Sequence, residues 1–513
     1  MEAAQRVPWE RVMSVIVVGA GPTGLMLAGD LAAAGVPVTV LEKRALESNL
    51  TRAFGVHART LEILDMRGCA DELVPQGRPV GMFRPQMGRG DLSLSFRHPE
   101  SRFPFVLIVP QARTEALLLR RAEELGAKIE TGAEVTGLEQ DAGGVALEVN
   151  GAPGPAADYV VGCDGAHSRV RALLGVGFTG RNYDTKLLLA DIRTTSRMQE
   201  GINGLMGRDG AILFPAFGDG WYRAVIWDRA QQGVPLEAPL GVAEVLESIR
   251  RISGRDIDIE EMRWSTRFLT ERRQADRYRV GRVFLAGDAA HVNSPMGSLG
   301  MNTGIQDAAN LAWKLIAAHR GRAPDWLLDS YQTERHPVGR TALKISDLLL
   351  RSAVAPRAVH VVRPYAARLV LAIPLITRFL RRTIAGMNIS YPAPPGLPRS
   401  SATGLRVDDR ELSVEGRRVR LYELVEPDRF LLLDHSEDGA AAAAVAGWGD
   451  RVTAVAAPGQ RPSRASTVML LRPDGYLAWS HRAPSPGRVR EAVAHWCGSP
   501  RPSPQGSSLS SSE

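Results

Sequence analysis

The chain has 513 residues, of which 44% are hydrophobic and 23% are charged, and its formal net charge is +7 at pH 7. This length exceeds one ordinary hydrophobic core and predicts two or three domains, and the composition is ordinary for a globular protein. The positive charge comes from scattered arginines and not from basic runs interleaved with aromatic residues. We therefore expect no nucleic-acid partner.

The cysteines and the apolar segments restrict the class of protein further. Cys69, Cys163 and Cys497 lie far apart without a CxxC pair, which argues against disulfides and against a Cys-ligated metal. We expect no metal site and a reducing, cytoplasmic location. The N-terminus lacks the apolar region of a signal peptide. The most membrane-like segment, residues 369–380, is too short to span a bilayer, so we expect a buried or interfacial helix there.

Residues 13–45 have the pattern of strand, tight turn, helix and strand. The turn, GAGPTG, places Gly19, Gly21 and Gly24 in the G-x-G-x-x-G arrangement, and Glu42 ends the second strand. In this context Gly19 allows the turn, Gly21 lets a pyrophosphate approach the backbone, and Gly24 lets the helix pack on the strand. Glu42 would then accept hydrogen bonds from the adenosine ribose. A glycine turn without a nucleotide is the alternative interpretation.

The middle of the chain changes character twice. A helix and a strand meander follow over residues 114–151, and CDGAHSRVR, residues 163–171, follows another strand. From residue 178 to 275 the pattern predicts a mostly β domain inserted into the first, with a hairpin turning near Gly218 and Gly220.

The last third begins with a buried strand and a long amphipathic helix. The helix, IQDAANLAWKLIAAHRG, has apolar positions at helical spacing. They include Ile305, Ala309, Ala312, Trp313 and Ile316. YPAPPGLPRS, residues 391–400, marks a linker. A small α/β module follows, and the Ser-rich end of the chain should be disordered.

The loop between that strand and that helix, SPMGSLGMNTG, is a second glycine-rich segment. Gly297, Gly300 and Gly304 surround Met301 and Asn302. Residues without side chains let backbone approach a planar ligand, and the N–H groups at a helix start favour negative charge. The N1–C2=O edge of a reduced flavin carries such a charge. Asp288 could hydrogen-bond the ribityl chain. A simple strand-to-helix turn is the alternative.

GAGPTG, CDGAHSRVR and GDAAHVNSPMGSLGMNTGIQDA, in this order and spacing, resemble the class A flavoprotein aromatic hydroxylases of the p-hydroxybenzoate hydroxylase fold. The C-terminal module resembles the third domain of phenol hydroxylase relatives, which include aromatic polyketide hydroxylases and rifampicin monooxygenase. The resemblance implies an α/β fold with a Rossmann-type FAD-binding domain, an inserted β-rich substrate domain and a thioredoxin-like C-terminal domain. The implied FAD-binding domain comprises residues 13–177 and 276–391, of which 340–391 form a helical extension. The substrate domain comprises residues 178–275, the third domain residues 400–497 and a disordered tail residues 498–513.

Site residues carried over from the family fall into three groups. FAD contacts are implied at Gly19, Gly21, Thr23, Gly24, Glu42, Lys43, Arg52, Gln111, Asp164, Asp288, Gly300, Met301 and Asn302. Positions at the reacting ring are implied at Arg52, Pro295 and Gly297. Candidate walls of the substrate site are Leu213, Phe214, Pro215, Trp227 and Met296, which could equally be core residues. Ser294 and Ser298 depart from the Pro and Gly that the family often has there. We expect His57, His167 and His291 to be local hydrogen-bonding residues.

The resemblance implies an FAD-dependent monooxygenase with tightly bound FAD and transient NADPH or NADH. It would insert one oxygen atom of dioxygen into an electron-rich aromatic ring through a C4a-(hydro)peroxyflavin. The three-domain layout favours a bulky polycyclic or polyketide substrate. Baeyer–Villiger insertion, rifamycin-type inactivation and hydroxylation of a simple phenol remain open. So do a non-oxygenating flavoprotein and a nucleotide-binding module without turnover. A homodimer is one option, and no membrane span is expected.

Overall fold

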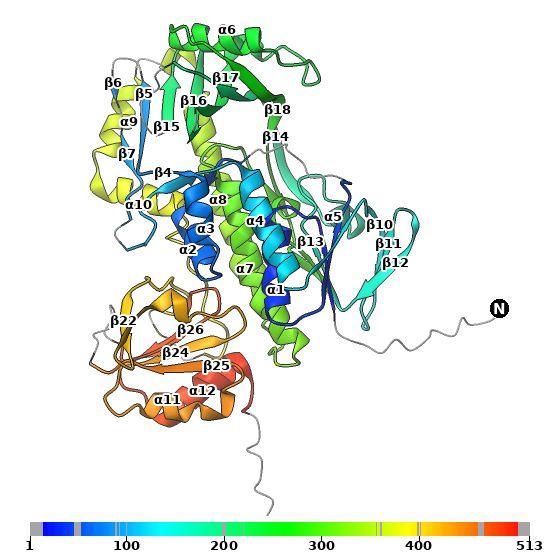
Figure 1. Cartoon of the computed structure of the whole chain (residues 1–513), viewed down its shortest axis with the longest axis vertical. Coiled ribbons are helices and arrows are strands. Elements are labelled where there is room, and N and C mark those ends of the chain that lie inside the picture. Colours follow the sequence, from blue (N-terminus) through cyan, green and yellow to red (C-terminus); the bar gives the residue numbers. More distant parts are fainter. Residues whose placement is uncertain are drawn as a thin grey trace, which may run out of the picture. The chain divides into compact units, whose positions relative to one another are not determined.

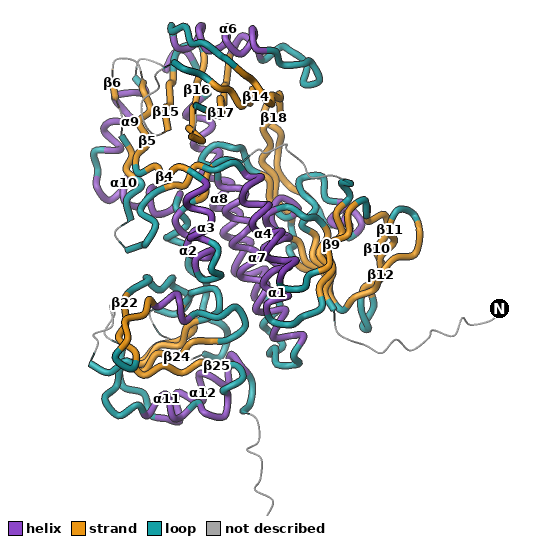
Figure 2. Tube along the Cα trace, viewed as in Figure 1, coloured by secondary structure: helices purple, strands orange, loops and turns teal. Residues whose placement is uncertain are grey.

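The computed structural model describes residues 14–45, 53–87, 90–91, 93–98, 100–196, 202–218, 220–354, 356–359, 362–397, 400, 402–459 and 466–500. The chain divides into two compact units. The first holds residues up to 312 together with 331–388, and the second holds 313–330 together with the chain from 389 onward. Each has its own mixture of helices and strands (Figures 1 and 2). The fold is therefore mixed α/β, as expected.

A largely parallel sheet forms the base of the first unit. Among the described residues its strand order is β19 (Arg279–Val280), β20 (Val283–Leu285), β13 (Tyr159–Gly162), β1 (Val15–Val18), β2 (Val38–Glu42) and β9 (Lys128–Thr131). All neighbours pair in parallel except β19, which is antiparallel to β20. β1 is buried along its whole length, as its continuous apolar sequence predicts.

Helices and small sheets complete this part of the first unit. The helices are α1 (Pro22–Ala33), α2 (Ala58–Asp65), α3 (Ala70–Leu73), α4 (Gln111–Glu124), α5 (Arg169–Leu173), the part of α7 (Leu299–His319) up to Ala312, and α8 (Ser330–Ala353) from Tyr331 onward. The small sheets are β3 (Gly55–Val56), β8 (Val106–Ile108) and β4 (Arg78–Val80), and β10 (Val135–Gln140), β11 (Val145–Val149) and β12 (Ala152–Ala157). The turn after β1 leads directly into α1, which places the carboxyl end of β1 at the start of that helix.

A larger, mainly antiparallel sheet carries the β-rich region. Its order is β21 (His291–Val292), β18 (Glu261–Ala275), β14 (Phe178–Arg193), β17 (Trp221–Asp228), β16 (Gly210–Gly218), β15 (Ile202–Met206), β5 (Met82–Met87) and β6 (Gly90–Asp91), with β7 (Leu94–Ser95) beside β5. The predicted hairpin is present as β16 and β17. Helix α6 (Val242–Ser253) packs across β15, β16 and β17 (Figure 1).

The large sheet extends beyond the range predicted for the β-rich domain. β15 pairs in parallel with β5, which comes from residues 82–87. Such a pairing joins segments more than a hundred residues apart, and the order of elements along the chain does not reveal it. The domain limits themselves therefore stay a prediction.

Two short helices near the end of the first unit bear on the expected buried or interfacial helix. Residues 369–380 fall in α9 (Arg363–Leu371) and α10 (Pro374–Ile384). Leu369 is 71% exposed and Leu375 is 79% exposed. The segment is therefore not buried, because these helices are apolar on more than the face that packs on the core, and the interfacial option stays a prediction.

The second unit is a small α/β module. Its sheet has the order β25 (Val452–Ala456), β24 (Phe430–Asp434), β26 (Val468–Leu471) and β27 (Leu477–His481), with β24 and β25 parallel and the other pairs antiparallel. A hairpin, β22 (Glu411–Val414) and β23 (Arg417–Arg420), and the helices α11 (Ala440–Ala444) and α12 (Pro486–Cys497) complete it. Trp313, on the amphipathic helix, belongs to its core with Phe430 and Trp496. Residues 501–513 of the predicted disordered tail lie outside the described residues.

Candidate functional site

One cavity of about 870 Å³ in the first unit joins the two glycine-rich segments. Gly19, Gly21 and Thr23 line it on the side of α1, and Asp288 and Met301 line it on the side of α7. This volume lies within the usual range for sites that hold a cofactor or drug-sized ligand. The two motifs, more than 260 residues apart in sequence, therefore face the same space.

The first turn shows a separate physical reason for each glycine. Gly19 has a φ of +106°, and a Cβ there would lie 2.5 Å from the carbonyl oxygen of Cys163. A Cβ on Gly24 would lie 2.0 Å from the carbonyl oxygen of Gly19. A Cβ on Gly21 would meet no atom within 4 Å. Gly19 and Gly24 are thus required by the packing of the protein itself, whereas the space beside Gly21 is open for a ligand.

The second segment uses its glycines to approach α1. A Cβ on Gly304 would lie 2.2 Å from Oγ1 of Thr23, and one on Gly287 would lie 2.6 Å from the same atom. The start of α7 and the end of the β20 strand therefore pack directly against Thr23. These glycines bring the second segment close enough for both motifs to share one cavity.

The start of α1 and the end of β2 supply complementary polar groups. Gly21 is the N-cap of α1, Pro22 follows it, and no side chain caps the helix. The helix N-terminus therefore offers backbone N–H groups and a favourable dipole to an anion. Glu42 accepts hydrogen bonds from the Ala20 N–H (2.8 Å) and from Nε of Arg44 (2.7 Å). Burial raises the pKa of Glu42, but these hydrogen bonds outweigh it and hold that pKa below its usual range.

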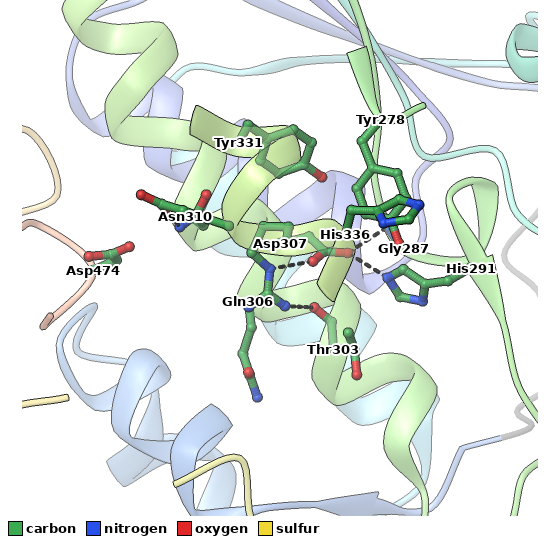
Figure 3. Close-up of polar contacts among 12 residues, drawn as sticks. Tyr278, Gly287, His291, Thr303, Gln306, Asp307, Asn310, Tyr331, His336 and Asp474 are labelled. Atoms are coloured by element: carbon green, nitrogen blue, oxygen red, sulfur yellow. Dashed lines mark hydrogen bonds and ion pairs between the residues drawn. The ribbon is translucent and has the colours of Figure 1, made fainter. Parts of the chain in front are cut away.

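A buried ionic network fixes the second segment. Oδ2 of Asp307, on α7, accepts a hydrogen bond from the Gly287 N–H (3.1 Å). The same oxygen lies 2.7 Å from Nε2 of His291, with which Asp307 pairs, as Figure 3 shows. Its Oδ1 accepts Nε of Arg335 from α8 (2.6 Å), and the same guanidinium donates to the carbonyl oxygen of Thr303 (3.1 Å). Burial raises the pKa of Asp307, but the charges of Arg335 and His291 hold it below its usual range. One carboxylate thus locks both ends of the loop that carries Asp288.

A second set of hydrogen bonds ties residues 53–57 to the loop before α7. Asn302 accepts the His57 N–H (2.8 Å) and donates to the carbonyl oxygens of Gly55 (2.8 Å) and Ser298 (2.6 Å). Nε2 of His57 lies 2.8 Å from the Gly297 carbonyl oxygen, and burial lowers the His57 pKa to about 4. His57 is therefore neutral near pH 7, and with the proton on Nε2 it donates to that carbonyl oxygen.

The predicted cofactor residues divide by their place relative to the cavity. The residues that line it are Gly19, Gly21, Thr23, Glu42, Lys43, Gln111, Asp164, Asp288, Pro295, Gly300 and Met301. Gly24, Gly297 and Asn302 are not in its lining and instead build the surrounding backbone. Asp164 accepts N–H groups of Arg169 and Val170 at the start of α5. Arg52 lies outside the described residues.

The predicted substrate residues lie in the core clusters beside the cavity. Trp227 belongs to a cluster that includes Phe54 and Leu189, and Leu213 and Met296 pack against it. Phe214 belongs to a different cluster, together with Val245 and Ile249 of α6. Phe214 therefore lies on the other side of the sheet from the cluster of Trp227, because successive residues of a strand face opposite sides, and its place in the substrate site stays a prediction. None of the five predicted substrate residues, Pro215 included, is in the described lining of the cavity.

Sequence reasoning missed residues that hold the site from a distance. Asp307 and Arg335 were not singled out, although an acidic residue within an apolar helix is a signal that it has a buried partner. The pair of Arg223 and Asp191 was also missed. Arg223 contacts both carboxylate oxygens of Asp191, at 2.7 and 2.9 Å, and donates to the Ala53 carbonyl oxygen (3.3 Å). No local pattern in the sequence indicates that pairing.

Comparisons with known proteins identify the family. Residues 12–346 match the FAD binding domain family, and residues 400–500 match the aromatic-ring hydroxylase C-terminal family. The chain belongs to the FAD-dependent aromatic-ring hydroxylases. The structure of an anhydrotetracycline hydroxylase from Streptomyces rimosus superposes with a TM-score of 0.82 at 36% identity, over 95% of this chain and 99% of that one.

Two relatives that align over nearly their whole length are named for different activities. A rifampicin monooxygenase from Streptomyces venezuelae is 38% identical over 91% of this chain and 96% of its own. A dialkyldecalin synthase from Streptomyces rugosporus is 32% identical over 94% of this chain and 99% of its own. The protein is a flavin-dependent monooxygenase by its family.

The cavity fits the FAD that this family binds. The open space at Gly21, the uncapped start of α1 and the ionised Glu42 suit the pyrophosphate and the ribose.

Proposed function

We propose that this enzyme consumes NADPH or NADH and transfers one oxygen atom from dioxygen to an electron-rich aromatic ring of a polycyclic or polyketide natural product. The observation that carries the proposal is the single cavity shared by both glycine-rich segments. Its volume of about 870 Å³ and its lining by both motifs suit a dinucleotide whose two ends are held by different motifs. The similarity to enzymes named for tetracycline and rifamycin substrates supports the substrate class.

The residues around the cavity have distinct roles in this proposal. The N–H groups at the start of α1, beside Gly21, bind the pyrophosphate, and the carboxylate of Glu42 accepts hydrogen bonds from the ribose hydroxyls. Gln111 and Lys43 line the adenosine and ribityl side, and Asp288 accepts a ribityl hydroxyl. Bound FAD supplies the hydride-accepting and oxygen-activating chemistry. Backbone at Gly300 and Met301, at the start of α7, stabilises negative charge on the ring system.

We infer that the reacting end of the cavity lies near Pro295, Ala53 and Phe54, which all line it. We place Arg52, Pro295 and Gly297 at the reacting ring, with Asp164 serving both FAD and the nicotinamide cofactor. We keep Leu213, Pro215, Trp227 and Met296 near the substrate, behind the residues that line the cavity. The apolar cluster of Trp227, against which Leu213 and Met296 pack, excludes water from the reacting atoms.

The finer organisation belongs to the same proposal. We infer a Rossmann-type FAD-binding domain around the parallel sheet, an inserted substrate domain around the large antiparallel sheet and a thioredoxin-like C-terminal domain. The C-terminal domain has no CxxC pair, so its role is structural or in assembly, for example as a homodimer. A cytoplasmic location suits the three cysteines of the whole chain, which are buried and form no disulfide.

Ring formation without oxygen insertion is the second candidate, favoured by the similarity to the dialkyldecalin synthase. The test is incubation of the FAD-loaded enzyme with NADPH, isotopically heavy dioxygen and a panel of tetracyclic polyketides and rifamycins. We expect a product that gains one heavy oxygen atom with NADPH consumption. A product of unchanged mass would support the second candidate. Position analysis then separates ring hydroxylation from Baeyer–Villiger insertion.

A further inference from the structure

Helices α9 and α10 expose a group of large apolar side chains. Tyr365 and Leu369 on α9 are 67% and 71% exposed, and Leu375 and Phe379 on α10 are 79% and 63% exposed. We call these four residues the apolar patch. Isolated exposed apolar residues are ordinary, but several gathered on neighbouring helices mark an interaction surface.

The two helices repeat one arrangement of apolar and basic residues. Arg368 follows Tyr365 by three positions and precedes Leu369, and Arg378 stands in the same relation to Leu375 and Phe379. Residues three and four apart share one face of a helix, so on each helix the first apolar residue lies beside both the second one and the arginine. Both arginines are exposed.

The opposite face of α10 anchors the helix to the unit. Ile384 is buried in the cluster around Phe54 and Trp227, and Leu380 packs against the same cluster. On the patch side, in the last turn of α10, Arg382 pairs with Glu100 and donates to Asn388, which adds a polar anchor. The apolar patch is therefore not needed to hold α10 in place.

The charge of this region selects the kind of partner. Residues 356–388, all within the first unit, contain six arginines and no Asp, Glu or Lys, and of these Arg382 is paired with Glu100. A second copy of the chain bound through the same face in a twofold manner would bring Arg368 and Arg378 of both copies together. A surface of anionic phospholipids instead offers apolar acyl chains to the patch and negative headgroups to the arginines.

We propose that α9 and α10 dock this enzyme on the surface of membranes rich in anionic phospholipid. Of the described helices, none is long and apolar enough to cross a bilayer, and docking requires only that the patch enter the headgroup region. The inference goes beyond the oxygenase chemistry and does not depend on it. Docking would place the enzyme where poorly water-soluble aromatic compounds concentrate.

The test is flotation of the full-length, FAD-loaded enzyme with two kinds of vesicle. One kind is phosphatidylcholine alone, and the other contains phosphatidylcholine and phosphatidylglycerol in equal parts. We expect binding to the anionic vesicles, weakened by salt. The double variant Leu375→Ser, Phe379→Ser should lower that binding at least about tenfold. The matched control Leu125→Ser changes an exposed leucine at the end of α4 and should bind as the wild type does.

Charge reversal tests the electrostatic half of the proposal. Arg368→Glu with Arg378→Glu should lower binding about twentyfold or more, because each basic residue near an anionic surface contributes about a factor of five. Arg208→Glu changes an exposed arginine of the large sheet region and is the control. NADPH oxidation without vesicles should stay unchanged in all variants, which shows that they are folded and FAD-loaded. Absence of binding to anionic vesicles, equal binding by the variants, or a dimer in sedimentation that the patch variants dissociate would overturn the proposal.

Discussion

Replacing Gly21 by Ser should separate cofactor binding from folding. Gly21 has a φ of −78° and a ψ of 176°, which any residue adopts, and its added Cβ would meet no protein atom within 4 Å. Serine is a favoured residue at a helix N-cap, so the free energy of unfolding of the apoprotein should change by less than about 1 kcal/mol. The serine side chain would fill the space proposed for the pyrophosphate.

The expected loss of affinity follows from the hydrogen bonds that the anion would lose. A hydrogen bond to a charged group contributes about 1.5–3 kcal/mol, so displacement of the phosphates should weaken FAD binding by about 3 kcal/mol. That corresponds to a rise in Kd of about a hundredfold. The assay is titration of the apoprotein with FAD, followed by quenching of FAD fluorescence, alongside denaturant unfolding without FAD.

Gly24→Ala is the contrasting variant. Its Cβ would lie 2.0 Å from the Gly19 carbonyl oxygen, so we expect it to destabilise the apoprotein by about 1–3 kcal/mol. The reasoning is refuted if Gly21→Ser binds FAD with the wild-type Kd, or if it unfolds the apoprotein as readily as Gly24→Ala does.

Three further predictions concern the groups around the cavity. Asp307→Asn removes the carboxylate that pairs with the buried Arg335 and should lower the free energy of unfolding by about 3 kcal/mol in denaturant titrations; an unchanged midpoint would contradict the network. Burial lowers the His57 pKa from 6.5 to about 4, so between those values the unfolded chain binds a proton that the folded chain excludes. His57 therefore contributes stability that is complete above pH 6.5 and lost as the pH falls toward 4, about 3 kcal/mol in all. His57→Gln should remove that part of the pH dependence, measured by unfolding at several pH values, and an identical slope would argue against it. Glu42→Gln removes the carboxylate charge that the ribose hydroxyls would meet and should weaken FAD binding about tenfold in the same fluorescence titration; unchanged affinity would place the ribose elsewhere.

The local part of the site was predictable because its signals are local. G-x-G-x-x-G after a buried strand requires a tight turn and a helix start, and the structure has both at Gly19 and Gly24. The glycine-rich segment before α7 was predicted to face the same ligand, and the shared cavity confirms the proximity of the two segments. These features depend on the positive φ of Gly19 and on close backbone approaches at Gly24 and Gly304 that a Cβ would block.

The residues that position the site from a distance were not predictable. The partner of Asp307 is Arg335 on another helix, and the guanidinium of Arg223 reaches the backbone of Ala53 across the first unit. Neither contact leaves a periodic pattern in the sequence. The cluster to which the side chain of Phe214 belongs was not predictable for a related reason. Alternation along β16 shows that Leu213 and Phe214 point to opposite faces, but only the position of α6 shows which face is covered.

The central claim is that one cofactor is held at both ends, by the turn at Gly21 and by the loop from Asp288 to Met301. Calorimetric titration of the apoprotein with FAD and with ADP tests it most directly, because ADP offers the adenosine and pyrophosphate without the ring system. We predict one FAD per chain, bound at least a hundredfold more tightly than ADP. A buried aromatic ring system makes enough contacts to contribute at least about 3 kcal/mol to the binding free energy, which corresponds to that factor. Equal affinities for the two ligands would contradict the claim, because the second loop would then contribute nothing to binding.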